Sequence, residues 1–140
     1  EWDDLVGTNM KAPFFLAQAA APWLRKSKGC IINLVDVHGI RPKKDFPVYC
    51  MAKAANAMMI MSMARELGPD VRVNGVAPGA ILWPEQEITD IDKARILSRV
   101  PLAKHGEVED IARTVRFLVT EADYITGQLI PVDGGRTAQQ

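Results

Sequence analysis

The stretch Cys-Ile-Ile-Asn-Leu-Val at positions 30–35 decides the fold of this chain. It is rich in β-branched residues and almost entirely apolar, without the regular alternation of apolar and polar residues that a half-exposed strand shows. Such a run is typical of a parallel strand that is covered on both faces. The strand is expected to end at Asp36, because Gly39, Pro42 and Pro47 make the following segment a loop.

The residues before this strand predict a long helix over positions 2–26. Their apolar side chains fall on more than one face of that helix, so more than one neighbour must cover it. The polar pair Thr8-Asn9 interrupts the apolar pattern, and Pro13 removes one helical hydrogen bond. The sequence therefore predicts a kink near Asn9.

The residues after the loop predict an alternation of helices and strands. Gly68-Pro69 and Pro78-Gly79 break the chain between elements, and the charged, proline-containing residues 80–102 are expected to form a mobile flap. The expected elements are a helix from Phe46 or Val48 to Leu67, a strand over 71–77, a short helix over 91–99, a helix over 107–120 and a strand over 128–132. This order predicts an α/β fold with a parallel sheet.

Such a sheet would hold only three strands, although the first is apolar enough for the middle of a larger sheet. The chain of 140 residues also begins inside a predicted helix and without a methionine. We therefore expect residues 1–140 to be one unit, the C-terminal half of a larger domain. Without the other half, an open apolar sheet edge would favour aggregation.

Composition argues against several classes of partner. Seventeen basic and seventeen acidic residues cancel, so the chain has no excess positive charge to bind nucleic acid or an anionic membrane surface. No run of the sequence approaches the roughly 20 apolar residues of a membrane span. Cys30 and Cys50 have no metal-ligand spacing around them. We expect two free thiols and no metal site, in a cytoplasmic protein.

Tyr49 and Lys53 are the first candidate functional residues. They are four positions apart, so a helix places them on one face and one turn apart. Tyrosine has an ordinary pKa of about 10 and is a poor acid at neutral pH, but a nearby cation favours its phenolate. Asp36 ends the buried strand and could reach the same pocket from the side. Alternatively, the Tyr-Lys pair could be exposed on its helix, and Asp36 could merely cap its loop.

Four motifs in a fixed order resemble the short-chain dehydrogenase/reductase family. The first is Tyr49-x-x-x-Lys53, with a polar residue at a strand end thirteen positions before the tyrosine. The others are Arg-Val-Asn-Gly-Val-Ala-Pro-Gly at 72–79, Ile-Thr-Gly-Gln at 125–128 and Val-Asp-Gly-Gly at 132–135. The resemblance covers essentially the whole chain. It implies the C-terminal part of a doubly wound, parallel-sheet Rossmann-type fold, without the family's Gly-rich cofactor-binding half.

The resemblance also implies roles for individual residues. Asn9 would hold a water that relays protons to Lys53, although Asn9 could also be a polar residue tolerated at a helix bend. Tyr49 would protonate the reduced substrate. Lys53 would lower the pKa of Tyr49 and hydrogen-bond the nicotinamide ribose. The residues that would border the nicotinamide are Pro78, Gly79 and Ile81.

Asp36 departs from the family pattern, because most members carry serine at this place. Aspartate here resembles the pteridine reductases, which reduce biopterin- and folate-type rings with NADPH. A carboxylate would repel the oxyanion that forms when a ketone is reduced. It would instead accept hydrogen bonds from a pterin ring and, with Tyr49, deliver a proton to a ring nitrogen. The resemblance thus implies reduction of a pterin or dihydrofolate that contacts Asp36, Tyr49, Leu82 and Trp83.

Two alternatives stay open. The chain could act on another carbonyl or imine substrate, or it could be a non-catalytic scaffold that retains the fold. No Gly-rich phosphate-binding loop occurs in the sequence, so the expectation of NADPH instead of NADH comes from the resemblance alone. In this family two long helices, which correspond here to the helix over 2–26 and the helix that ends at Leu67, commonly pair across a dimer axis within tetramers. The resemblance therefore implies a homo-oligomer, a dimer of dimers.

Overall fold

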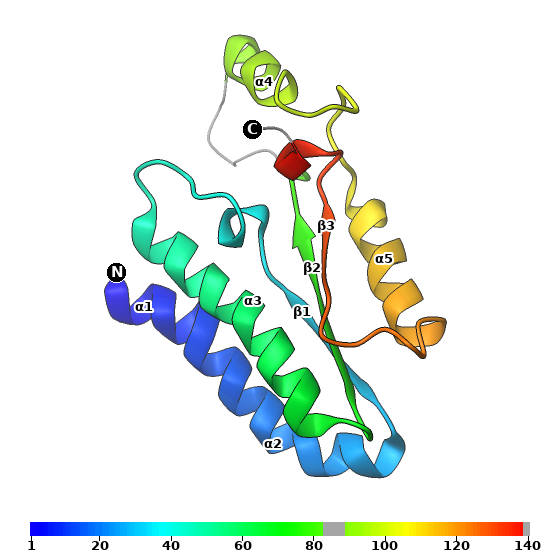
Figure 1. The fold of residues 1–140 in the computed structure, drawn as a ribbon. Helices are drawn as coiled ribbons and strands as arrows, with labels where there is room; N and C mark the ends of the chain where they lie inside the picture. Colours follow the sequence, from blue (N-terminus) through cyan, green and yellow to red (C-terminus); the bar gives the residue numbers. More distant parts are fainter. Residues whose placement is uncertain (83–88, 139–140) are drawn as a thin grey trace.

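The computed structural model describes residues 1–82 and 89–138 (Figure 1). At its centre lie three parallel strands in the order β1-β2-β3, namely β1 (Cys30–Leu34), β2 (Arg72–Pro78) and β3 (Leu129–Val132). The register places Asn33 opposite Gly75 and Val76 opposite Ile130. The predicted α/β fold with a parallel sheet is therefore confirmed.

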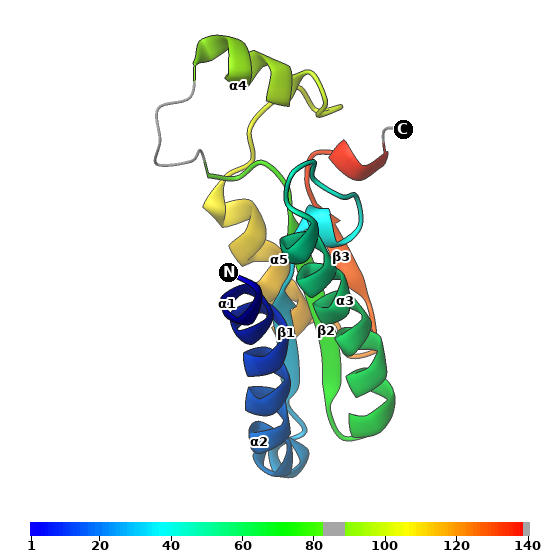
Figure 2. The ribbon, with the colours of Figure 1, turned by 90° about the vertical axis from the view of Figure 1, so that its left-hand side faces the viewer.

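Helices lie on both sides of this sheet (Figures 1 and 2). One side carries α1 (Trp2–Val6), α2 (Ala12–Ser27) and α3 (Pro47–Leu67), and the other carries α5 (Val108–Thr120). Each side has its own apolar core on β2. Ile60 of α3 packs in the core that contains Val73, whereas Leu118 of α5 packs with Val76. The short helix α4 (Asp90–Leu97) stands beyond the C-terminal ends of the strands.

The N-terminal helix is interrupted where the sequence predicts it. Gly7–Lys11 form a π-helical turn between α1 and α2, with Asn9 at its middle. Pro13 lies just after this turn, and because the helix runs on from the π-helical turn into α2 without a break, the missing N–H removes one helical hydrogen bond there. The interruption therefore lies in the turn that precedes Pro13, at the predicted position near Asn9. Pro22, which the sequence prediction overlooked, lies inside α2 without ending it.

β1 is an edge strand, whereas its apolar sequence predicts the middle of a sheet. Among the described residues, no strand pairs with its outer side, and Leu34 at its end is 56% exposed. The helix α3 has apolar side chains on all sides, but only one of its sides is buried in the protein. On the other sides Met51, Met58 and Met61 are exposed. The expected open apolar surfaces are thus present in this chain.

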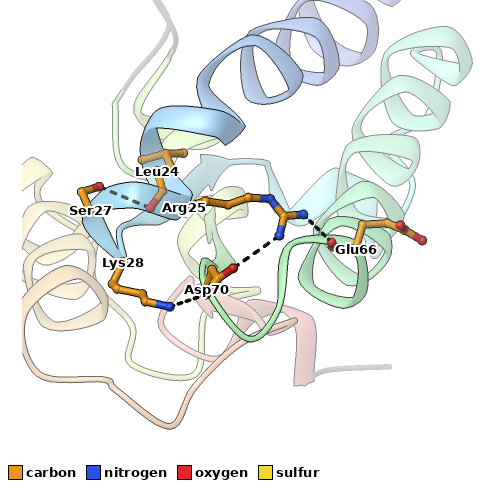
Figure 3. A network of polar contacts seen from close by, with 6 residues as sticks. All are labelled: Leu24, Arg25, Ser27, Lys28, Glu66 and Asp70. Carbon is orange, nitrogen blue, oxygen red and sulfur yellow. Dashed lines mark hydrogen bonds and ion pairs between the residues drawn. The ribbon is translucent and has the colours of Figure 1, made fainter.

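Charged side chains tie α2 to α3 at the end of the sheet opposite Asp36 (Figure 3). Arg25 donates a hydrogen bond to the backbone carbonyl of Glu66 (2.9 Å), and its guanidinium lies 3.5 Å from Asp70. Lys28 also pairs with Asp70, and the cations of Lys28 and then Arg25 lower the pKa of the Asp70 carboxyl. None of the helices in the described part of the chain has the length and hydropathy needed to cross a membrane.

Candidate active site

Asp36 and Tyr49 meet at the C-terminal end of the sheet. Asp36 follows β1 and begins the 3-10 turn η2 (Val37–Gly39), and Tyr49 lies in the first turn of α3. The Tyr49 hydroxyl donates a hydrogen bond to Asp36 Oδ2 over 2.8 Å. Asp36 Oδ1 accepts the backbone N–H of His38 over 2.7 Å. Asp36 therefore caps its loop and also reaches the tyrosine, so both roles weighed from the sequence occur together.

Gly39 explains why the Asp36 turn lies so close to α3. A Cβ at this position would lie 3.0 Å from the backbone carbonyl group of Lys53 and 3.2 Å from the backbone nitrogen of Ala54. Only a residue without a side chain fits this approach without displacing a neighbour. The glycine thus brings the turn against the helix that carries Tyr49 and Lys53.

Lys53 lies one turn after Tyr49, as the four-residue spacing predicts. Its ammonium lies 5.6 Å from the centre of the Tyr49 ring. Burial lowers the pKa of Lys53, whereas the nearby Asp36 carboxylate opposes that shift. In the described residues, Lys53 forms no ion pair with a carboxylate. The ammonium is half-buried. Because it forms no such ion pair, its N–H donors stay available for a ligand.

The pKa of Tyr49 is raised above its ordinary value and not lowered. Burial is the main cause, and the hydrogen bond and negative charge of Asp36 add to it. The expectation that Lys53 lowers the pKa of Tyr49 is therefore wrong for this structure, because burial and then the contact with Asp36 raise that pKa instead. Tyr49 is protonated at neutral pH, as an ordinary tyrosine is, and the raised pKa makes it a weaker proton donor in this arrangement.

The side chain of Asn9 makes its hydrogen bonds within its own helical turn and not to Lys53. Its side-chain nitrogen donates to the Leu5 carbonyl (3.0 Å) and to the Thr8 hydroxyl (3.1 Å). Its backbone carbonyl accepts a hydrogen bond from Asn56 Nδ2 (3.0 Å), and Asn56 Oδ1 accepts one from Asn33 (2.8 Å). Three asparagines therefore connect the π-helical turn, α3 and β1.

Asn56 is the site-supporting residue that sequence reasoning missed. It is only 2% exposed and lies on α3, among alanines and methionines. A lone amide in such an apolar stretch is the signal that could have identified it, because buried amides need hydrogen-bond partners. Its contact with Asn9 fixes the position of the π-helical turn relative to the helix that carries Tyr49.

The other predicted site residues follow β2 at the same end of the sheet. The Gly79 N–H donates to the Val132 carbonyl over 3.0 Å, just after Pro78. Ile81 lines a cavity of about 330 Å³ on the α5 side, and Leu82 is 75% exposed. Trp83 lies outside the described residues. The structure thus brings Asp36, Tyr49 and Lys53 together, with Pro78 and Gly79 at the neighbouring strand end.

Known proteins are similar in sequence to this chain over nearly its whole length. A family model described as enoyl-(acyl carrier protein) reductase matches residues 1–137. The 3-oxoacyl-(acyl-carrier-protein) reductase FabG of Staphylococcus aureus is 42% identical over 139 residues, and that of Thermotoga maritima is 39% identical over 140 residues. A meso-2,3-butanediol dehydrogenase of Serratia marcescens is 36% identical over 146 residues. These matches cover 96%, 96% and 99% of this chain and 56% of each relative.

Solved structures share the fold as well. An apo SCOR enzyme from Clostridium thermocellum superposes with a TM-score of 0.88 at 35% identity, over 100% of this chain and 55% of the other. Acetoin dehydrogenase YohF from Salmonella typhimurium gives a TM-score of 0.85 at 34% identity, over 99% and 56%. The chain spans just over half the length of the relatives that it matches. Its sequence, its parallel sheet and its Tyr49-Lys53 helix show that the chain belongs to the short-chain dehydrogenase/reductase family.

Proposed function

We propose that residues 1–140 are the catalytic half of an NAD(P)H-dependent short-chain reductase. The observation that carries this proposal is the environment of Tyr49. Its hydroxyl is hydrogen-bonded to Asp36 over 2.8 Å, and the Lys53 ammonium lies one turn away, 5.6 Å from the centre of the Tyr49 ring. Reduction of a double bond by hydride needs a proton at the second atom, and a positioned neutral phenol supplies it.

The described residues fit the nicotinamide end of such a cofactor. The half-buried Lys53 ammonium has donors for ribose hydroxyls. Pro78, Gly79 and Ile81 are proposed to border the ring, beside the strand end that carries Asp36. The cofactor supplies the hydride when it is bound, and we propose NADPH.

Tyr49 is proposed to transfer its hydroxyl proton to the oxygen or nitrogen that becomes basic during reduction. The hydroxyl must first leave Asp36 Oδ2, its acceptor in this structure. The Lys53 ammonium then stabilises the phenolate that remains. Asn9 is proposed to contribute by placing its backbone carbonyl near this helix, where Asn56 holds it, and by holding a water that relays protons to Lys53.

The names of the relatives favour a carbonyl or alcohol substrate over the pterin hypothesis. A 3-oxoacyl reductase and a butanediol dehydrogenase both have names that refer to carbon–oxygen groups. The general activity that we propose is therefore reduction of a C=O or C=N bond. The specific substrate is a separate proposal, because the relatives are matched over only part of their length.

A pterin or dihydrofolate is the second candidate, and Asp36 is the observation that favours it. A carboxylate 2.8 Å from the Tyr49 hydroxyl would oppose a developing oxyanion. The same carboxylate would accept hydrogen bonds from ring N–H groups of a pterin. Leu82 and Trp83 are proposed to cover the flat ring.

One assay separates these candidates. The complete polypeptide is mixed with NADPH, or in parallel NADH, and with dihydrobiopterin, dihydrofolate or a panel of ketones, and cofactor oxidation is followed. Turnover of pterins without ketones would support the role proposed for Asp36. Turnover of ketones without pterins would rule out the pterin candidate. Absence of turnover with every substrate would contradict the proposed activity and favour a non-catalytic scaffold.

A homo-oligomer is proposed from the outer faces of α2 and α3. A groove of about 410 Å³ between α2 and α3 is almost entirely apolar and is lined in part by Phe14, Phe15 and Met58. Phe15 is 53% exposed and Met58 is 57% exposed, and apolar surface of this kind is typical of subunit contacts. We propose that the two helices pair with those of a second copy, and that two such dimers form a tetramer.

A cytoplasmic location is proposed from the thiols. Cys30 and Cys50 are both free, and Cys50 is buried. Its thiol accepts the Lys43 N–H over 3.2 Å and so has a structural contact of its own. Free thiols persist where the surroundings are reducing.

A further inference from the structure

A pocket with three arginines lies beside the candidate active site. Its volume is about 380 Å³. Arg41 comes from the loop after β1, Arg99 follows α4, and Arg136 begins the short 3-10 helix η3 (Arg136–Ala138) after β3. The other lining residues are Val37, His38, Pro42 and Thr137. In Figure 1 the loop after β1 and η3 lie at the C-terminal end of the sheet.

Among the described residues, no carboxylate lines this pocket. The ion pairs formed by residues 1–82 and 89–138 involve other cations, namely Arg25, Lys28, Lys93, Arg95 and Arg113. Asp133 is the acidic residue nearest to Arg136 in the sequence. Its two oxygens accept the N–H groups of Gly135 (2.8 Å) and Thr137 (2.7 Å), and among the described residues it forms no ion pair with Arg136.

The positive charge of the pocket is local and permanent. The chain has equal numbers of basic and acidic residues, so the three arginines do not reflect a general excess of positive charge. A guanidinium stays protonated at every physiological pH. Three such groups around one concavity repel one another, and an anion bound between them would relieve that repulsion.

The pocket shares a chain segment with the active site. Val37 and His38 line the pocket and directly follow Asp36. The His38 N–H donates to Asp36 Oδ1 over 2.7 Å, while His38 Nδ1 lies 3.2 Å from the Arg41 carbonyl oxygen. The same short turn therefore presents Asp36 to Tyr49 and forms one wall of the cationic pocket.

We propose that this pocket binds the anionic end of a small molecule, a phosphate or a carboxylate, whose other end lies at Asp36 and Tyr49. The planar guanidinium matches the two oxygens of either group and can form paired hydrogen bonds with them. The apolar Val37 and Pro42 would contact the uncharged part of the ligand. The link to Tyr49 rests on the proposed reductase function, whereas binding of an anion in the pocket does not depend on it.

Calorimetric titration tests the pocket without any turnover. The complete polypeptide is titrated with glutarate and, separately, with inorganic pyrophosphate at constant low ionic strength. The Arg99→Gln and Arg136→Gln variants should each weaken binding by about tenfold or more, because each removes a charge-assisted hydrogen bond. The matched control is Arg116→Gln, an exposed arginine of α5, which should change binding by less than about twofold.

Either of two results would overturn the proposal. One is the absence of saturable binding of both anions to the unmodified protein, and the other is an equal effect of Arg116→Gln and Arg136→Gln. The two probes also separate the possible sources of the anionic group. Tighter binding of glutarate would indicate carboxylates, and tighter binding of pyrophosphate would indicate phosphates.

Kinetics then test the connection to the active site. Dihydrofolate has carboxylates in its tail and dihydrobiopterin has none, so Arg136→Gln should raise the KM for dihydrofolate about tenfold and leave its kcat unchanged. The KM for dihydrobiopterin should not change. Equal changes in KM for both substrates would show that the pocket does not bind the dihydrofolate tail during the reaction. Anion binding without turnover of either pterin would sustain the pocket and reject the pterin substrate.

Discussion

The Tyr49 hydroxyl is hydrogen-bonded to Asp36 over 2.8 Å, and this contact joins the end of β1 to the start of α3. The second oxygen of Asp36 is held by the His38 N–H. The backbone therefore fixes the carboxylate while the tyrosine uses its remaining oxygen. A substrate that takes the Tyr49 proton has to replace an acceptor that is already in place.

Replacing Asp36 by Asn should lower the pKa of Tyr49. Burial raises this pKa and would persist, but the negative charge of Asp36, which also raises it, would be lost. The pKa should therefore fall toward its ordinary value of about 10 without reaching it. The measurement is the difference between ultraviolet tyrosinate titrations of the two proteins. Tyr124 is fully exposed and contributes equally to both, so unchanged curves would remove Asp36 as a cause.

The same shift predicts a change in the pH dependence of reduction. Proton donation requires neutral Tyr49, so activity is lost as pH rises through its pKa. A lower pKa in Asp36→Asn moves this alkaline limb of the pH–rate profile to lower pH. A limb that stays in place or moves to higher pH would contradict the expected direction.

Replacing Tyr49 by Phe should reduce turnover by about 10²- to 10⁴-fold, the usual contribution of a positioned proton donor. The fold should be retained, because Asp36 keeps its hydrogen bond from His38. Turnover and circular dichroism are measured together. Tyr124→Phe is the matched control at an exposed position, and equal activity of the two variants would exclude Tyr49 as the donor.

Replacing Gly39 by Ala should lower both stability and activity. The new Cβ would lie 3.0 Å from the Lys53 backbone, so the turn must move away from α3, at a cost of about 1–3 kcal/mol. That movement would lengthen the contact between Asp36 and Tyr49. Denaturant unfolding and kcat measure the two effects. Gly7→Ala is the control, since a Cβ there meets no atom within 4 Å, and it should not destabilise the protein.

Replacing Asn56 by Ala should cost about 1–3 kcal/mol of unfolding free energy, because the Asn9 carbonyl and the Asn33 amide lose their partner. Denaturant titration measures this loss. Glu66→Ala, exposed on the same helix, should change stability by no more than about 0.5 kcal/mol. Similar values for the two variants would mean that the asparagine contacts add little.

Replacing Met58 by Glu should weaken self-association. Met58 is 57% exposed on the apolar groove between α2 and α3, and a carboxylate there would lose its water on pairing with a second copy. Sedimentation velocity should show smaller species at the same concentration. Val119→Glu on α5 is the control, and a Met58→Glu protein with the unmodified sedimentation profile would place the interface elsewhere.

The alternation of elements could be predicted because apolar periodicity and breakers are local signals. Gly68-Pro69 ends α3 in the structure as the sequence indicates, and helix and strand limits differ by one or two residues from those expected. The meeting of Asp36 and Tyr49 was also within reach, since a strand end and the first turn of the next helix lie at the same edge of a parallel sheet. These features depend on residue type and order.

The features that could not be predicted from the sequence are the contacts between particular side chains, because these depend on the three-dimensional positions of the residues. Four-residue spacing puts Lys53 on the face of Tyr49, but it does not tell which charged group contacts the hydroxyl, and in the structure the Asp36 carboxylate does so. The three arginines of the cationic pocket are separated by 58 and 37 positions in the numbering. Only the closure of the fold brings them together. The same holds for the contact between Asn9 and Asn56.

The outer edge of β1 has a consequence for how copies of this chain would assemble. Pairing through α2 and α3 can close around a two-fold axis and stop at a finite size. The row of backbone N–H and C=O groups along β1 lies at the edge of the sheet, where among the described residues only β2 pairs with it. Addition of strands at such an edge has no built-in end point. Whether preparations of this chain stay as discrete particles therefore depends on what covers five residues, Cys30–Leu34.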